Sequence, residues 1–207
     1  MLLSRRALNK AETRASIARS AISILKNSGI EGLTADKIAE SAGISRRTFF
    51  NYFPTVDSAL NVPVEQFIEA VLSAVEELDD SVPLSEAAVL AVSQMRDLEL
   101  YRSVAEMFLL AQSHPPLARL QTETWDSCSL SLAEFLKERY SRPLDLDSFA
   151  FVFAITGAGK AAFVYWAQES GGDLSDASLK LLHSYLVDAL STLRDGFPTI
   201  RSFSRGA

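Results

Sequence analysis

Residues 33–60 constrain the fold of this chain more than any other stretch, because they read as two short helices joined by a glycine turn. Thr34 can cap the backbone donors of a first helix that runs through Ile38, and Gly43 supplies the left-handed dihedrals of a tight turn. Ser45 can cap a second helix that follows the turn directly. The spacing therefore predicts a helix-turn-helix unit near the amino end.

The second helix of this unit has two chemically different faces. Successive helical residues rotate by about 100°, so Phe49 and Phe53 fall on one stripe. Burying that stripe turns the polar side chains of the helix outward and leaves Arg46 and Phe50 on its flanks. The helix would then present a basic, polar face to whatever the chain binds.

A face of this composition suits the major groove of double-stranded DNA, because recognition helices read base edges with residues of their first turns. Arginine, asparagine and threonine carry the donors and acceptors that base edges and phosphates require. An ordinary solvated corner has the same bare pattern, so the particular residues decide between the two interpretations. The candidate DNA-contacting residues are Thr34, Ser45, Arg46, Arg47, Thr48, Phe50, Asn51 and Tyr52.

The segment TADKIAESAGISRRTFFNYFPT, followed by Leu60, resembles the N-terminal DNA-binding domain of TetR-family regulators. The shared features are the threonine cap, an Ile-Ala pair, an Ala-Gly turn, Ser45, Thr48, an aromatic run and a Tyr-Phe ending. The resemblance covers roughly the first quarter of the chain. It implies an all-α fold, with an N-terminal three-helix DNA-binding domain and a C-terminal helical domain for ligand binding and dimerisation.

Two positions depart from the family pattern. Val56 stands where the family usually has a lysine, and Phe50 stands where it usually has a tyrosine. Each of those family residues commonly contacts the DNA backbone, so their loss weakens phosphate anchoring. Arg46 and Arg47 add charge that can compensate.

The charges divide unevenly along the chain. Up to Leu60 there are nine Lys or Arg against five Asp or Glu, whereas the remainder has 11 against 21. The overall charge of −6 hides this division. A basic amino end can meet a polyanion while an acidic remainder stays away from it.

Helical patterns run through the rest of the chain, and no stretch alternates with a period of two as a strand would. We predict a helix-turn-helix domain over residues 1–55, a helical effector-binding and dimerisation domain over 56–200, and a tail over 201–207. The first helix is expected over 9–27, with Gly29 as its stop and a basic arm at Arg5 and Arg6 ahead of it. A helix from Val56 to Leu78 contains Pro63, which either kinks it or starts a separate helix.

The middle of the chain offers one helical stripe from Leu84 through Met95 to Leu98, an apolar segment over 104–111 and a long helix over 117–139. Residues 149–167 are apolar almost all round, and 175–193 form a leucine-rich helix. Pairing both helices with their copies in a second chain covers them in a four-helix bundle. The dimer would then place its two helix-turn-helix units on the two half-sites of a palindromic operator. A membrane span is disfavoured because Lys160 falls within the apolar segment.

The resemblance implies a small-molecule effector, apolar or amphipathic, between the helices of the body. The candidate effector contacts are Met107, Phe108, Gln112, Trp125, Phe151, Lys160, Tyr165 and Trp166. Aromatic stripes at helical spacing also serve as plain core or dimer contacts, and that alternative stays open for each residue.

Other classes of function have little support. The Gly157, Gly159 and Lys160 run lacks the first glycine and the hydroxyl residue of a phosphate loop. His114 and His183 have no partners at metal-ligand spacing, and Cys128 reads as a buried apolar residue. A single cysteine and the absence of an apolar leader favour a cytoplasmic location. We therefore expect no enzyme activity, no metal and no cofactor.

The sequence thus predicts a homodimeric DNA-binding transcriptional regulator, most simply a repressor that a small-molecule effector releases from its operator. The alternative is a helical protein that binds a ligand or a partner and whose DNA binding is weakened, as Val56 and Phe50 allow.

Overall fold

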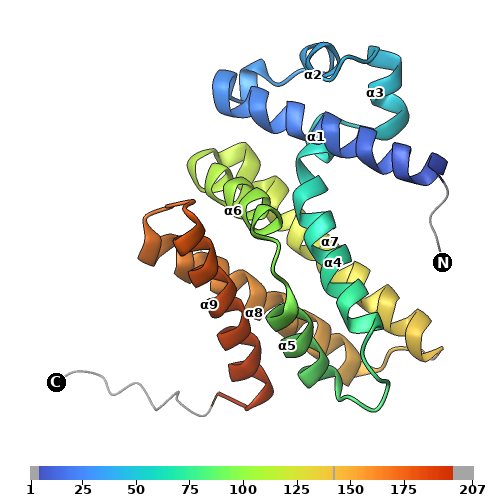
Figure 1. Cartoon of the computed structure of the whole chain (residues 1–207), viewed down its shortest axis with the longest axis vertical. Coiled ribbons are helices and arrows are strands. Elements are labelled where there is room, and N and C mark those ends of the chain that lie inside the picture. The colour runs from blue at the N-terminus through green and yellow to red at the C-terminus, as the bar shows by residue number, and fades with distance from the viewer. Residues whose placement is uncertain (1–4, 142, 198–207) are drawn as a thin grey trace. The chain divides into compact units, whose positions relative to one another are not determined.

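The computed structural model describes residues 5–141 and 143–197, and all of their regular structure is helical. The chain divides into two compact units, Met1–Gln66 and Phe67–Ala207, so the division falls inside a helix rather than after residue 55. The predicted tail over 201–207 lies outside the described residues. Figure 1 labels the helices from α1 to α9 in chain order.

The first unit contains α1 (Arg5–Gly32), α2 (Ala35–Ser41), α3 (Arg46–Tyr52), the 3-10 turn η1 (Asp57–Asn61) and the start of α4 (Val62–Glu76). Its core draws one stripe from each helix: Ile17 and Ala21 of α1, Ile38 of α2 and Phe49 of α3 are fully buried. The predicted three-helix unit is therefore present, with its apolar faces turned toward one another.

The helix α1 is longer than expected. It begins at Arg5, so Arg5 and Arg6 belong to the helix and not to an arm ahead of it. Gly29 interrupts the helical dihedrals with φ 65° and ψ −175°, as predicted for the stop, but one more turn follows as far as Gly32. The break needs a glycine because its φ lies in the left-handed region.

Helix α4 begins at Val62 and not at Val56, which settles the question about Pro63. A separate 3-10 turn, η1, occupies residues 57–61, and Pro63 lies in the first turn of α4. Proline is tolerated there because an amide in the first turn of a helix has no intrahelical acceptor to lose. Pro63 starts a helix, and the kink is not found.

The second unit continues with α5 (Leu84–Gln94), α6 (Leu98–Ser113), α7 (Pro115–Tyr140), α8 (Leu146–Ser170) and α9 (Asp176–Arg194). Helices α8 and α9 run side by side, and α5 packs against α9 (Figure 1). The most deeply buried side chains here include Tyr101, Phe163, Trp166, Leu179 and Leu182. The expected long helices in this part of the chain are confirmed.

The continuous stripe expected from Leu84 to Leu98 is wrong. Helix α5 ends at Gln94, and Asp97 caps a new helix: one carboxylate oxygen accepts from the amides of Glu99 at 3.0 Å and Leu100 at 3.3 Å. An aspartate cap satisfies amides that a helix start leaves free, and this outweighs the apolar spacing that suggested one helix.

Candidate nucleic-acid interface

The turn between α2 and α3 is set by one glycine. Gly43 has φ 67°, and a Cβ added there would meet no atom within 4 Å, so the requirement is for the dihedral angle alone. The Gly43 amide donates to the carbonyl of Glu40 at 3.1 Å, and the Ile44 amide donates to that of Ala39 at 2.9 Å. This pair of bonds is a Schellman motif, which ends α2 and fixes the direction in which the chain enters α3.

Hydroxyl groups cap both helices of the unit, as the sequence predicts. The Thr34 hydroxyl accepts from the Lys37 amide at 3.3 Å, and the Ser45 hydroxyl accepts from the Thr48 amide at 3.0 Å. The hydroxyls of Ser45 and Thr48 also share a hydrogen bond of 2.8 Å. These contacts hold the first turn of α3 in one geometry before any ligand arrives.

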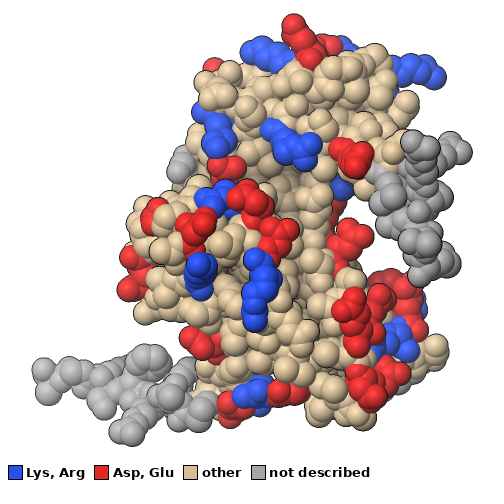
Figure 2. Space-filling model, viewed as in Figure 1, with Lys and Arg blue, Asp and Glu red and all other residues tan. Residues whose placement is uncertain are grey.

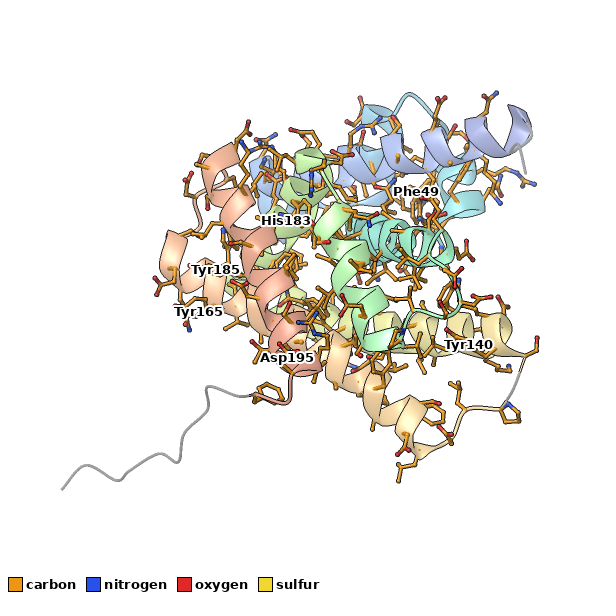
Figure 3. The ribbon with its side chains drawn as sticks, turned by 60° about the horizontal axis from the view of Figure 1, so that its bottom comes forward. Phe49, Tyr140, Tyr165, His183, Tyr185 and Asp195 are labelled. Atoms are coloured by element: carbon orange, nitrogen blue, oxygen red, sulfur yellow. The ribbon has the colours of Figure 1, made fainter. Side chains whose placement is uncertain are left out.

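The two faces of α3 separate as predicted. Phe49 and Phe53 are 0% and 1% exposed, and their ring centroids lie 5.7 Å apart in the core of the unit. Figure 3 shows Phe49 beneath α1. Arg46, Arg47 and Asn51 are exposed on the other side of the helix. Because α3 is anchored by its aromatic face, its polar face has a fixed orientation.

The two arginines at the start of α3 differ in their surroundings. Arg46 forms an ion pair of 3.3 Å with Asp36, and its guanidinium lies 5.7 Å from the centroid of the Phe50 ring. Both partners of the pair are well exposed, so the pair contributes little to stability. Arg47 makes no ion pair with another described residue and is therefore the more available cation.

The loop after α3 is capped but carries no cation at the family's usual position. Thr55 and Ser58 form a reciprocal pair, in which each amide donates to the other's hydroxyl at 3.3 and 3.2 Å. This reciprocal pair holds the turn at the start of η1. Val56, between them, is half-buried. A valine offers no charge to a phosphate, so this anchor is absent in this chain.

Arg14 of α1 is a residue that sequence reasoning missed. Its guanidinium lies 4.9 Å from the centroid of the Phe53 ring and forms an ion pair of 2.6 Å with Glu65. Arg14 falls on the same helical stripe as Ile17 and Ala21, which was a signal that it faces the core. It braces the buried edge of α3 and is not free to meet DNA.

A family model described as bacterial regulatory proteins of the tetR family matches residues 17–57, the stretch that contains α2, the Gly43 turn and α3. This match assigns the helix-turn-helix unit to the TetR family.

Two relatives are transcriptional regulators by name, and one solved structure shares the fold. A transcriptional regulator of Mycobacterium tuberculosis named for mycofactocin biosynthesis is 22% identical over 165 residues, which cover 78% of this chain and 83% of the relative. The HTH-type transcriptional regulator EthR of Mycolicibacterium smegmatis is 28% identical over 116 residues, which cover 56% of this chain and 49% of that relative. A structure from Mesorhizobium loti, named as a TetR-family regulator, superposes with a TM-score of 0.52 at 15% identity, covering 94% of this chain and 98% of the other.

The second unit, here called the body, leaves an apolar surface uncovered along α8 and α9. Phe149, Phe153 and Val164 of α8 and Leu181 of α9 are 38–55% exposed. Figure 3 shows Tyr165 of α8 beside Tyr185 of α9, with ring centroids 4.9 Å apart. By length and composition alone α8 could also cross a membrane, and only 17% of its most apolar stretch is buried.

The candidate effector residues do not all lie together. Phe108 and Trp125 both pack on Phe163, at 5.5 and 6.0 Å between ring centroids, and Met107 is buried. Phe108 and Gln112 line a cavity of about 380 Å³, and Phe151 lines another of about 290 Å³. Lys160 and Tyr165 are exposed, and Trp166 is fully buried.

Tyr101 of α6 was not singled out from the sequence, yet it places a polar group in the core of the body. Its side chain is 0% exposed, and its hydroxyl has no hydrogen-bond partner among the described residues. The ring lies between Phe67 and His183, each at 5.5 Å between centroids. Burial raises the pKa of this hydroxyl well above its ordinary value. An unpaired buried hydroxyl is costly, so its presence calls for a functional reason.

Most of the acidic residues belong to the second unit. Figure 2 shows acidic side chains over the turn between α4 and α5, where Glu76, Glu77, Asp79 and Asp80 follow one another in the sequence. Among residues 5–141 and 143–197, no three His, Cys, Asp or Glu side chains come together as metal ligands would.

Proposed function

We propose that this chain is a homodimeric repressor, which binds a palindromic operator and leaves it when a small molecule occupies its helical body. The observation that carries the proposal is the exposed face of α3, where Arg47 and Asn51 stand out from a helix anchored on its opposite side by Phe49. A rigid helix with free donors on one face is what major-groove reading requires.

The seven polar candidates among the DNA contacts each have a role in this proposal. Arg47, Thr48 and Asn51 meet base edges, and Arg46 meets a base or a phosphate. Thr34, Ser45 and Tyr52 approach the DNA backbone, where hydroxyls and helix amides bind phosphate oxygens. The cap hydroxyls remain engaged with their amides while they do so, since a hydroxyl has more than one bonding site.

A second copy of the chain is the proposed partner for α8 and α9. Exposed phenylalanine and leucine side chains on adjacent helices lose unfavourable contact with water when a copy covers them. Gly157, exposed in the middle of α8, lets another helix approach closely. A membrane explains the same apolar surface less well, because Lys160 is exposed within it. A regulator of this kind would act in the cytoplasm, beside its DNA.

The proposed effector enters the body near the aromatic side chains that join α4, α6, α7 and α8. Phe108, Trp125 and Phe163 supply apolar contacts, and the unpaired Tyr101 hydroxyl supplies one hydrogen bond. By linkage, such a ligand lowers operator affinity only as far as it prefers the unbound conformation.

A gel-shift titration of the full chain against the DNA that flanks its own gene, repeated at several salt concentrations, tests the DNA-binding part of the proposal. Binding should weaken as salt rises, in proportion to the number of phosphates neutralised. Arg47→Ala should lower affinity by roughly tenfold to 100-fold. Arg119→Ala removes the same charge from α7, where Arg119 is 86% exposed, and should leave affinity unchanged.

Absence of binding to every DNA fragment at low salt would contradict the proposal. It would favour the alternative, a helical protein that binds ligands or partners through its body. Equal losses in the Arg47→Ala and Arg119→Ala variants would mean that net charge, and not the face of α3, attracts the DNA.

A further inference from the structure

Phe50 is an apolar side chain on the otherwise polar face of α3. It is 44% exposed, although its neighbour Phe49 is fully buried. The Phe50 ring meets the Phe49 ring edge to face, at 5.3 Å between centroids and 86° between planes. Because Phe49 is fixed in the core, this contact limits where the Phe50 ring can lie.

Arg46 also contacts the Phe50 ring. Residues 46 and 50 are one helical turn apart, and the guanidinium lies 5.7 Å from the ring centroid. Asp36 of α2 holds that guanidinium through the ion pair of 3.3 Å. Phe50 is therefore an exposed ring held by a core aromatic residue and by a paired arginine.

A phenyl ring at this place cannot anchor a phosphate, because it has neither a donor nor an acceptor. The edges of base pairs in the major groove carry one apolar group, the C5 methyl of thymine. Cytosine presents an amino donor and the purines present polar groups at the corresponding edges. Among base edges and phosphates, the chemistry of Phe50 therefore matches the methyl group of thymine.

We infer that Phe50 reads the methyl group of a thymine in each half-site of the operator, with Arg46 holding the ring in place. This inference rests on the proposed function, since it requires α3 to enter the major groove. It also gives a reason for the departure from tyrosine: a backbone anchor common to all sequences is exchanged for a contact with one base.

Replacing thymine by deoxyuridine tests the inference, because deoxyuridine pairs in the same way and lacks only the methyl group. Each thymine of a bound operator half-site is replaced in turn, and affinity is measured by fluorescence anisotropy. At one position per half-site the wild-type chain should lose affinity by about threefold to fivefold, the value for one buried methyl group.

Three variants identify the residue responsible for that loss. Phe50→Ala should bind the thymine and deoxyuridine operators equally well. Phe50→Tyr keeps the ring and should keep the discrimination between them. Arg47→Ala should bind both operators more weakly while the ratio of their affinities stays the same. Phe50 is exposed, so these substitutions leave the core of the unit intact, which circular dichroism verifies.

The possible failures are distinguishable. A chain that binds its operator but tolerates deoxyuridine at every position, or a Phe50→Ala variant that still discriminates, overturns the inference and leaves DNA binding standing. A wild-type chain that binds no DNA refutes the inference together with the proposed function.

Discussion

The indole N–H of Trp166 in α8 donates to both the carbonyl oxygen and the hydroxyl of Ser178 in α9, at 3.0 and 2.9 Å. Trp166 is 0% exposed, so this contact replaces water for a donor that has no access to it. The bond joins the two helices that we propose to form the dimer surface. Its loss should therefore affect the stability of the body directly.

Trp166→Phe should lower the free energy of unfolding by about 1–3 kcal/mol, because it removes the donor of a buried hydrogen bond between α8 and α9. Urea denaturation followed by circular dichroism, at one fixed protein concentration, measures the change. Trp125→Phe is the matched control, since the Trp125 indole is only partly buried and donates no hydrogen bond to another described residue. An equal loss of stability in both variants would show that the smaller ring, and not the missing hydrogen bond, lowers the free energy of unfolding.

Tyr101→Phe should stabilise the ligand-free protein by about 1 kcal/mol, because it removes a buried hydroxyl that has no partner. Thermal unfolding measures the shift, and Tyr140→Phe, which changes an exposed tyrosine, is the control. If Tyr101→Phe were clearly destabilising, the hydroxyl would have a partner in solution and would not be available to an effector.

The raised pKa of the Tyr101 hydroxyl makes the stability of the folded protein depend on pH. Burial raises the pKa of Tyr101 in the folded state, while the unfolded chain keeps the ordinary value near 10. Above pH 10 the unfolded state releases this proton and the folded state retains it, so stability falls as pH rises, by about 1.4 kcal/mol per pH unit for this group. Below pH 10 the group contributes no slope. Urea titrations between pH 8 and pH 11 (roughly the range in which tyrosines ionise) should show a constant difference in stability between wild type and Tyr101→Phe below pH 10, and a difference that grows above it.

Gly43→Ala should destabilise the first unit by about 1–2 kcal/mol, because alanine resists the φ of 67° that the turn requires. DNA binding should fall with it, since α3 would leave the turn in a different direction. Gly43→Asn should recover much of the loss, because asparagine enters the left-handed region more readily. Thermal unfolding and gel shifts on both variants check this prediction. Equal losses of stability in Gly43→Ala and Gly43→Asn would show that the positive φ of residue 43 is not the cause.

Phe153→Glu should convert the dimer into a monomer, because it places a charge in the apolar surface of α8 where Phe153 is 55% exposed. Light scattering on a size-exclusion column reports the mass. Leu130→Glu, at a leucine of α7 that is 66% exposed, is the control and should remain dimeric. A Phe153→Glu chain that keeps its dimer would place the interface elsewhere.

The helix-turn-helix unit could be predicted from the sequence because the residues that form its caps and its turn interact with residues only a few positions away. Thr34 and Ser45 cap helices that start one residue later, and Gly43 closes α2 through bonds that reach back no further than Ala39. The stripe of Phe49 and Phe53 follows from helical rotation alone. Local chemistry of this kind needs no knowledge of the distant chain.

Boundaries between helices were harder to predict where two local signals compete. The apolar spacing through Met95 favoured one helix, whereas the carboxylate of Asp97 favoured a new start, and the cap prevailed. Pro63 presented a similar choice between a kink and a helix start. Such choices depend on how the flanking segments pack, which the spacing of residues does not state.

Within residues 33–60, amino-acid chemistry alone was enough to indicate a capped helix pair with an exposed basic face. The character of the body depended instead on contacts between residues far apart in the chain. The indole of Trp166 can donate to Ser178 only once α8 and α9 have packed together. The Tyr101 hydroxyl is enclosed beside Phe67 and His183, without a partner among the described residues, only once α4, α6 and α9 have packed together. Burial and pairing are properties of that packing, because a side chain loses water only when several distant segments cover it at the same time.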